Sequence, residues 1–227
     1  MTAADDALVE LRRRILAGSL VAGSKLHQAE LAAALGMSRI PVRDAIRSLA
    51  AEGLVVLEPR RSAIVAPLSV NDLAELYELR LAIEPHLSAL AVSKLGAADL
   101  LAMRGMLAAM EQAVDHPSWL DANDEFHAHL YRRSGRPRMM SLLDQARAQT
   151  RRYTGLRLDL GRPDLDSEHR LILAAAERRN PAAIQALVQA HLYSAYSMVR
   201  KQLDGRGEDF GNYPASLEGG ASGAGMS

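Results

Sequence analysis

The sequence contains no cysteine and carries no excess charge of either sign. The absence of cysteine excludes disulfides, thiolate metal ligands and cysteine nucleophiles, and it favours a cytosolic location. Lysine plus arginine and aspartate plus glutamate both total 27, so no global field draws the chain to nucleic acid or to anionic lipid. The first residues lack the apolar core of a signal peptide, and no uncharged apolar run is long enough to cross a bilayer. We therefore expect a cytoplasmic protein with no membrane partner.

The first part of the chain combines short helical patterns with one hairpin. Apolar residues at helical spacing precede Gly18, a second short pattern ends at Gly36, and a third runs from Ser38 to Gly53. Two short β-branched runs, 54–57 and 63–66, then flank turn-forming residues. Residues 1–67 are therefore predicted to form three helices and a β-hairpin.

The rest of the chain shows only helical periodicity before it becomes rich in glycine. Breaks near residues 96, 116, 135, 161 and 180 divide residues 68–204 into six helices, which predicts an all-α six-helix bundle. Residues 205–227 hold seven of the sixteen glycines and have no apolar period, so a disordered tail is expected there. The predicted fold class is mainly α.

The stretch LGMSRIPVRDAIRSLAAEGLV, residues 35–55, predicts a helix with one apolar and one basic side. Its buried stripe is expected to consist of Val42, Ala45, Ile46 and Leu49. The opposite side carries Arg39, Ile40, Arg43, Asp44 and Arg47. Ser38 is placed to cap this helix, and Pro41 is tolerated because the first turn has no intrahelical N–H bond to lose.

Two short helices joined through Gly36, the second presenting a polar N-terminal face, have the geometry of a helix-turn-helix. An arginine fork grips guanine or a phosphate with two bonds, and the hairpin tip adds Arg60 and Arg61 for a second groove. A row of arginines alone is more often a solvated basic face. Its coincidence with a two-helix unit, a cap and a basic hairpin favours binding to double-stranded DNA.

The segment ELAAALGMSRIPVRDAIRSLAAEGLV resembles the winged helix-turn-helix of GntR-type bacterial transcription regulators. The all-α remainder resembles the FadR-type branch of that family, which carries an FCD effector domain. The resemblance implies that DNA meets the wing together with Ser38, Arg39, Ile40, Pro41 and Arg43, and we add Arg47 from the basic face. Ile40 stands where the family usually has threonine, and Ser62 stands where the wing usually has glycine.

Four polar residues on three predicted helices of the second part are candidate metal ligands. Asn123 and His127 lie one turn apart on one helix, and His169 and His191 lie on the next two. Three imidazoles and an amide oxygen suit Zn²⁺, Ni²⁺ or a similar divalent ion. From the residues alone, separate hydrogen bonding of each histidine is the more common arrangement. The family resemblance implies the metal site, because the four positions match its ligand pattern in order.

Arg80 occupies an apolar helix stripe together with Glu84, one turn away. The two side chains can simply pair with each other. The family resemblance instead implies that Arg80 lies at an effector cavity and binds the carboxylate of a small organic acid. Arg151 and Tyr153 are further candidates for the wall of this cavity.

Together these features predict a homodimeric, ligand-responsive transcription regulator that binds a near-palindromic operator. Repression is the commoner mode in the family that the chain resembles. An alternative is a metalloenzyme with an accessory DNA-binding domain, but the metalloprotease motif HExxH and the paired ExxH motifs of di-iron bundles are absent. A third possibility, a protein scaffold, predicts no affinity for DNA.

Overall fold

The computed structural model describes residues 2–58, 63–154 and 162–204, and it is mainly helical as predicted. The described residues form two compact units, one of residues 2–58, 63–69 and 148–154 and the other of residues 70–147 and 162–204. The predicted wing tip with Arg60 and Arg61, and the predicted tail, lie outside the described residues. None of the helices in these ranges combines the length and the apolar character that a membrane crossing requires.

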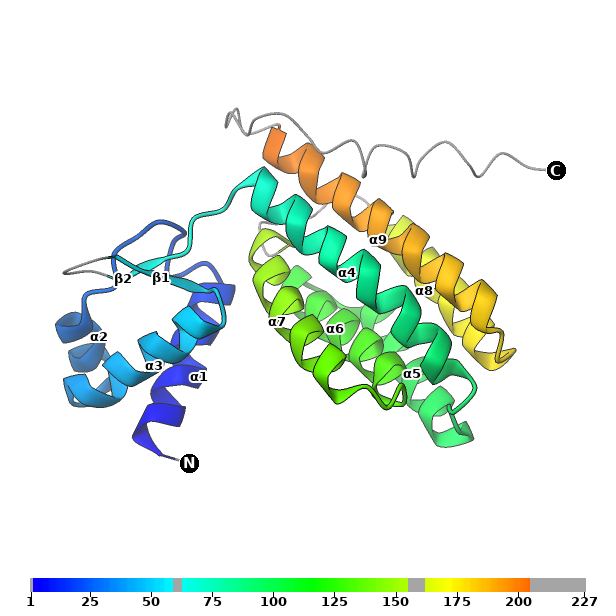
Figure 1. Cartoon of the computed structure of the whole chain (residues 1–227), viewed down its shortest axis with the longest axis horizontal. Coiled ribbons are helices and arrows are strands. Elements are labelled where there is room, and N and C mark those ends of the chain that lie inside the picture. Colours follow the sequence, from blue (N-terminus) through cyan, green and yellow to red (C-terminus); the bar gives the residue numbers. More distant parts are fainter. Residues whose placement is uncertain (1, 59–62, 155–161, 205–227) are drawn as a thin grey trace. The chain divides into compact units, whose positions relative to one another are not determined.

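The first unit begins with three short helices. These are α1 (Ala3–Leu16), α2 (Gln28–Leu35) and α3 (Arg39–Ala51), shown in Figure 1. Thr2 and Asp5 form a reciprocal capping box that satisfies two backbone N–H groups at the start of α1. Gly36 ends α2 in the left-handed conformation, with φ +64°, and so turns the chain toward α3.

The core of the first unit lies between α1 and α3. Leu11 of α1 and Val42 and Leu49 of α3 are completely buried there. Strands β1 (Val55–Leu57) and β2 (Ala63–Val65) then pair antiparallel and form the predicted hairpin. The hairpin adds its inward-facing side chains to the same core, so α1, α3 and the hairpin are packed together.

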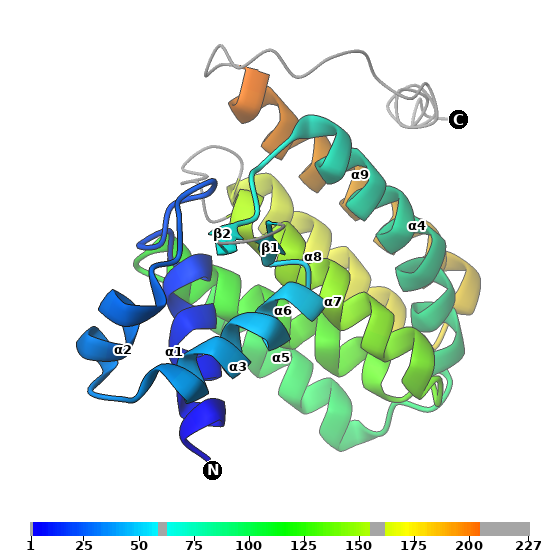
Figure 2. The same ribbon diagram turned by 60° about the vertical axis from the view of Figure 1, so that its left-hand side comes forward.

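The described part of the second unit contains the six predicted helices. They are α4 (Val70–Val92), α5 (Ala97–Gln112), α6 (His116–Arg132), α7 (Pro137–Thr154), α8 (Arg162–Glu177) and α9 (Pro181–Asp204). The last residues of α7, 148–154, belong to the first unit. Helices α4 and α9 lie side by side, α5 packs against α6, and α8 packs against both α5 and α9 (Figures 1 and 2).

Helix α6 carries polar residues on its buried face. Phe126 and Leu130 are completely buried, as an apolar stripe requires. His127 and Tyr131 share this buried face at 1% and 0% exposure. Burial of a polar group destabilises the fold unless the group has a hydrogen-bond partner. His127 and Tyr131 are therefore the residues of this face for which a functional role is sought.

The left-handed conformation of Gly36 leads to a prediction. A Cβ added there would meet no other atom, so Gly36→Ala should destabilise the first unit through backbone strain alone, by about 1–2 kcal/mol. Gly105→Ala is the matched control, because Gly105 lies within α5 and its added Cβ also meets nothing. This change should stabilise the second unit by about 0.5–1 kcal/mol. Urea denaturation followed by circular dichroism measures both effects, and equal effects of the two substitutions would contradict the assignment.

Candidate functional site

Helix α3 has one buried and one exposed side, as the sequence predicts. The apolar stripe of Val42, Ala45, Ile46 and Leu49 is at most 1% exposed. Ser38, Arg39, Ile40, Arg43 and Arg47 are exposed, and Pro41 is half-buried. The basic residues and one large apolar side chain, Ile40 at 62% exposure, therefore face outward from the first unit together.

Asp44 is the internal partner of two of these arginines. Its Oδ1 lies 3.5 Å from Nε of Arg43 and 4.0 Å from Nη1 of Arg47, and both arginine side chains are about half or more exposed. Exposed ion pairs of this kind contribute roughly 0–1 kcal/mol. Neither contact therefore ties its guanidinium group firmly, and both groups are available to an external partner.

Ser38 does not cap α3 with its side chain, which corrects the expectation from the sequence. Its backbone has the extended conformation of an N-cap residue, with φ −74° and ψ 166°. An N-cap side chain normally accepts from the second or third N–H of the helix, and the third position here is Pro41, which has no N–H. The Ser38 hydroxyl therefore makes no cap bond and is exposed at the start of the helix.

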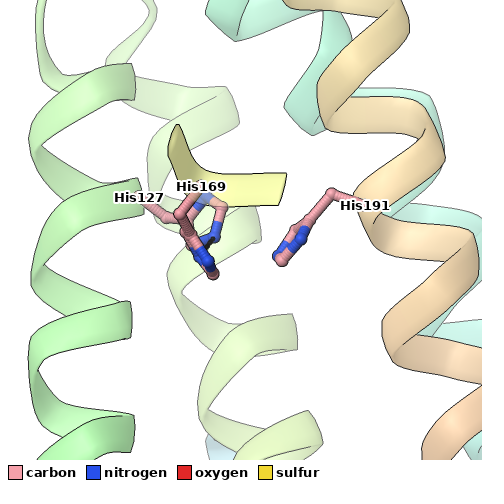
Figure 3. Close-up of side chains that lie close together, drawn as sticks. All are labelled: His127, His169 and His191. Carbon is pink, nitrogen blue, oxygen red and sulfur yellow. Dashed lines mark hydrogen bonds between the residues drawn. The ribbon is translucent and has the colours of Figure 1, made fainter. Parts of the chain in front are cut away.

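Three histidines from three helices meet in the core of the second unit. His127 belongs to α6, His169 to α8 and His191 to α9, and their rings turn toward a common point (Figure 3). One ring nitrogen from each lies within 4.8 Å of the other two. The Nε2 atoms of His127 and His169 are only 3.0 Å apart. The three side chains are 0–4% exposed, so the cluster is buried in the core of the unit.

The outer nitrogens of the three rings fix where their protons lie. Nδ1 of His169 is 2.6 Å from the carbonyl oxygen of Leu165, and Nδ1 of His191 is 2.7 Å from a carboxylate oxygen of Glu168. Both oxygens can only accept, so each Nδ1 carries the proton. Nε2 of a neutral ring then has only a lone pair, and in His169 and His191 this lone pair faces the cluster.

His127 also carries its proton on Nδ1, and the acceptor of this proton is a tyrosine hydroxyl. Its Nδ1 lies 3.2 Å from the hydroxyl of Tyr131, which donates its own proton to Glu84 at 2.7 Å. The tyrosine oxygen therefore accepts from Nδ1–H of His127. With this arrangement of protons all three Nε2 atoms present lone pairs to one another, which suits the binding of a metal cation.

The pKa values of the histidines favour a metal cation over a proton. Burial lowers the pKa of His127 and of His169 well below the ordinary 6.5, and the neighbouring His191 lowers both further. Neutral imidazole is the form that binds metal. At neutral pH His127 and His169 therefore offer ring nitrogens that protons do not occupy.

Asn123 completes the predicted ligand set. It lies on α6, and its Oδ1 is 2.9 Å from Nε2 of His169. Three imidazole nitrogens and one neutral oxygen suit Zn²⁺ or Ni²⁺. The residues present therefore fit a divalent transition metal, and the structure brings together all four positions singled out from the sequence.

Arg80 and Glu84 form a buried ion pair on α4. Nε of Arg80 donates to Oε1 of Glu84 at 2.6 Å, and the guanidinium carbon lies 4.8 Å from the centre of the Tyr77 ring. Burial by itself raises the pKa of Glu84, but the charges of Arg80 and Arg147 outweigh it and hold that pKa below its ordinary value. Glu84 is therefore an ionised group at the centre of the unit. The ion pair between Arg80 and Glu84, which the sequence offered as one of two alternatives, is therefore formed.

Arg147 and Tyr131 take part in this network but were not singled out from the sequence. Nη2 of Arg147 donates to Oδ1 of Asp124 at 3.0 Å, and Nη1 lies 3.9 Å from Oε2 of Glu84 without a hydrogen bond. Arg147 follows Leu143 by one turn of α7, on the buried face of that helix. An arginine in an apolar stripe is the same signal that identified Arg80, so it could have been found.

The remaining candidates lie elsewhere. Arg151 and Tyr153 belong to the last turn of α7, which groups with the first unit, and the Tyr153 hydroxyl accepts from the backbone N–H of Ser69. They stay predictions for the effector site. His129, on α6, lies 3.3 Å from Asp99 and not in the cluster.

Both units match known protein families. Residues 3–65 match the bacterial regulatory proteins of the gntR family, and residues 75–194 match the FCD domain. The chain is 34% identical over 131 residues to an HTH-type transcriptional regulator from the TAR-I ttuE-ttuC' intergenic region of Agrobacterium vitis, covering 53% of this chain and 74% of that protein.

Longer matches cover nearly the whole chain. The HTH-type transcriptional repressor GlaR of Escherichia coli (strain K12) is 25% identical over 209 residues, covering 86% of this chain and 94% of that protein. The solved structure of E. coli McbR/YncC superposes with a TM-score of 0.80 at 22% identity, covering 89% of this chain and 99% of that one. The structural likeness shows a shared fold.

The single tryptophan provides a test of the cluster. Trp119 lies on α6, donates to Asp166 at 2.8 Å, and its ring centre is 6.1 Å from that of His169. Addition of Ni²⁺ to metal-free protein should quench Trp119 emission, because an open-shell ion at the histidines lies close to the indole. A fluorescence titration measures this, with His169→Ala as the unresponsive control. Unchanged emission from protein that elemental analysis finds loaded with Ni²⁺ would place the ion elsewhere.

Proposed function

We propose that this chain, which belongs to the gntR family of bacterial regulatory proteins and carries an FCD domain, is a transcription regulator controlled by a small organic acid bound beside a metal ion. The observation that supports this control most directly is the meeting of three histidine lone pairs in the core of the second unit. A regulator of chromosomal genes acts in the cytoplasm, where we place this protein.

The exposed basic side of α3, from its first turn to Arg47, is the proposed contact with operator DNA. Arg39, Arg43 and Arg47 supply guanidinium forks for guanine edges or phosphates. Ile40 offers an apolar surface suited to the methyl group of thymine. Ser38 and the free N–H groups of the first turn suit a phosphate. Arg60 and Arg61 of the hairpin tip remain the predicted contact in the neighbouring groove.

The proposed active form is a homodimer on a near-palindromic operator. In a helix-turn-helix dimer, each recognition helix enters one major groove, and the half-site centres are about 34–36 Å apart or a multiple of this. Repression is the mode suggested by the relative GlaR, whose name describes a repressor.

His127, His169, His191 and Asn123 are the proposed ligands of one divalent metal ion, Zn²⁺ or Ni²⁺. When bound, such an ion supplies positive charge and an open coordination position for a carboxylate. Asn123 is neutral, so these four side chains contribute no negative charge of their own. An anionic effector is the ligand that this donor set favours.

Arg80 is the proposed anchor of the effector. Its Nε donates to Glu84, so this hydrogen bond occupies neither of its two terminal nitrogens. Those nitrogens can grip a carboxylate with two bonds. The effector can shift the regulator between DNA-binding and released arrangements only by the difference of its affinities for the two.

A metalloenzyme is not supported as an alternative. Both family matches and the names of the relatives belong to transcription regulators. The histidine cluster therefore serves control of DNA binding in this proposal and not turnover of a substrate.

The first prediction from this function concerns DNA. Arg43→Ala should weaken binding to a duplex enriched from the genome by this protein, by about 1–3 kcal/mol, because a two-bond base contact is lost. Arg60→Ala and Arg61→Ala should weaken binding with less sequence selectivity and flatten its salt dependence. Fluorescence anisotropy at matched salt measures these affinities.

Arg170→Ala is the matched control for this experiment. Arg170 is also exposed and also paired with one carboxylate, Glu111, but it lies on α8 of the second unit. Its loss removes one positive charge without touching α3, so it should leave the affinity unchanged. Parent-like binding by all the α3 and wing variants would show that DNA meets another face.

The second prediction concerns the metal. Elemental analysis should find about one equivalent of the ion per chain in the parent, and His127→Ala and His191→Ala should each lose it. Loss should also lower the melting temperature, because an ion at 1,000 times its Kd stabilises the folded state by about 4 kcal/mol. A chelator should produce the same shift in the parent and little further change in the variants.

His129→Ala is the control, because His129 lies on the same helix as His127 but faces Asp99. It should retain the ion. Asn123→Asp should hold the ion more tightly, since a carboxylate is a stronger ligand for a divalent cation than an amide. A parent that carries no metal, and whose melting temperature does not respond to Zn²⁺ or Ni²⁺, would leave the histidines without this role.

A further inference from the structure

His127 differs from the other two histidines in what lies behind it. His169 is held by a backbone carbonyl and His191 by the carboxylate of Glu168, both in direct contact. His127 is held by a tyrosine hydroxyl, and the tyrosine in turn donates to a carboxylate. The partner of His127 is thus a chain of two groups from two different helices.

The two groups behind His127, the Tyr131 hydroxyl and the Glu84 carboxylate, are completely buried. Tyr131 on α6 and Glu84 on α4 are both 0% exposed, and the two hydrogen bonds measure 3.2 Å and 2.7 Å. The two carboxylate oxygens have separate partners, since Oε2 accepts from Tyr131 and Oε1 accepts from Arg80 at 2.6 Å. The groups therefore run in the order His127, Tyr131, Glu84 and Arg80 without a gap.

The direction of each hydrogen bond follows from the chemistry of the groups. An ionised carboxylate only accepts, so Tyr131 donates to Glu84, and the tyrosine oxygen is left to accept from Nδ1–H of His127. Hydrogen bonds in such a chain polarise one another. Glu84 therefore strengthens the tyrosine oxygen as an acceptor, and the stronger acceptor makes Nε2 of His127 a better electron-pair donor.

We infer that Tyr131 and Glu84 are positioning residues that keep the Nε2 lone pair of His127 directed at the metal site, and that they connect this site to Arg80. The inference rests on the metal site proposed above and extends it to a regulatory link. Because Glu84 is shared, a ligand that draws Arg80 away from Glu84 acts on His127 through the same hydrogen bonds. Metal and anion are then linked, and each changes the affinity for the other by the same factor.

The primary test replaces the tyrosine hydroxyl. Tyr131→Phe should weaken Ni²⁺ binding by about 10–100-fold, the usual effect of removing the hydrogen-bond partner of a ligand histidine. Competition with a chromophoric chelator measures this affinity. Tyr77→Phe is the matched control, because Tyr77 is equally buried and its hydroxyl has no hydrogen-bond partner among the described residues. It should bind Ni²⁺ as the parent does, and equal effects of the two substitutions would overturn the inference.

A spectroscopic measurement separates positioning from a general loss of structure. Long-range ¹H–¹⁵N correlation spectra of the metal-free protein report which ring nitrogen carries the proton. His127 should be protonated at Nδ1 in the parent. In Tyr131→Phe the Nε2–H form should appear, because Nδ1 has lost its acceptor and Nε2–H can donate to His169. An unchanged proton position in Tyr131→Phe would contradict the inference even if metal affinity fell.

The role of Glu84 is tested by a cycle of substitutions with Ni²⁺ alone as the probe. Glu84→Gln should weaken Ni²⁺ binding several-fold in the parent and have almost no effect in Tyr131→Phe, because its influence passes through the hydroxyl. An equal effect in both backgrounds would show that Glu84 acts on the metal through its charge at long range, and this would overturn the link through Tyr131.

The outcomes distinguish failure of the metal site from failure of the positioning role. If the parent binds no Ni²⁺, the metal site itself fails. If the parent binds it and Tyr131→Phe binds equally well, only the positioning role fails.

Discussion

Three imidazole lone pairs directed at one another are the constraint on which the second unit depends. Nδ1 of each ring lies within hydrogen-bond distance of an oxygen acceptor, and the Nε2 atoms of His127 and His169 approach to 3.0 Å. Hydrogen bonding could satisfy any of these histidines separately. Their convergence from α6, α8 and α9 is the reason that we propose a metal cation among them, and burial disfavours a proton there because it lowers the pKa values of His127 and His169.

The charges around this point explain why its ligand should be an anion. Arg80 and Arg147 are both nearly buried and share Glu84, while Asp124, the other partner of Arg147, is partly exposed to solvent. The donor set itself is neutral, since Asn123 takes the place of a carboxylate. A metal ion would leave this region with surplus positive charge, and a small carboxylate bound by Arg80 would offset it. In the proposed function, the metal ion, the effector and the ion pair therefore belong to one electrostatic arrangement.

Most of the fold could be predicted because particular residue types in the sequence show where each helix ends. Glycine and proline separate the helices of the second unit, and the apolar stripe of α3 follows the helical period. The four candidate metal ligands were found because the chain resembles a known ligand pattern. Tyr131 was missed because its role depends on contact with a residue 47 positions away, which no local pattern reveals. The cap bond expected from the Ser38 side chain is not formed, and Pro41 at the third helical position has no N–H to donate to it.

The central claim is that three histidines bind one metal ion, and X-ray absorption at the metal edge tests it most directly. Protein loaded with one equivalent of Zn²⁺ should show nitrogen or oxygen neighbours at about 2.0–2.1 Å, with the outer-ring scattering of three imidazoles. His191→Ala, if it retains any Zn²⁺, should show fewer imidazoles. A spectrum with only oxygen neighbours and no imidazole scattering would contradict the account.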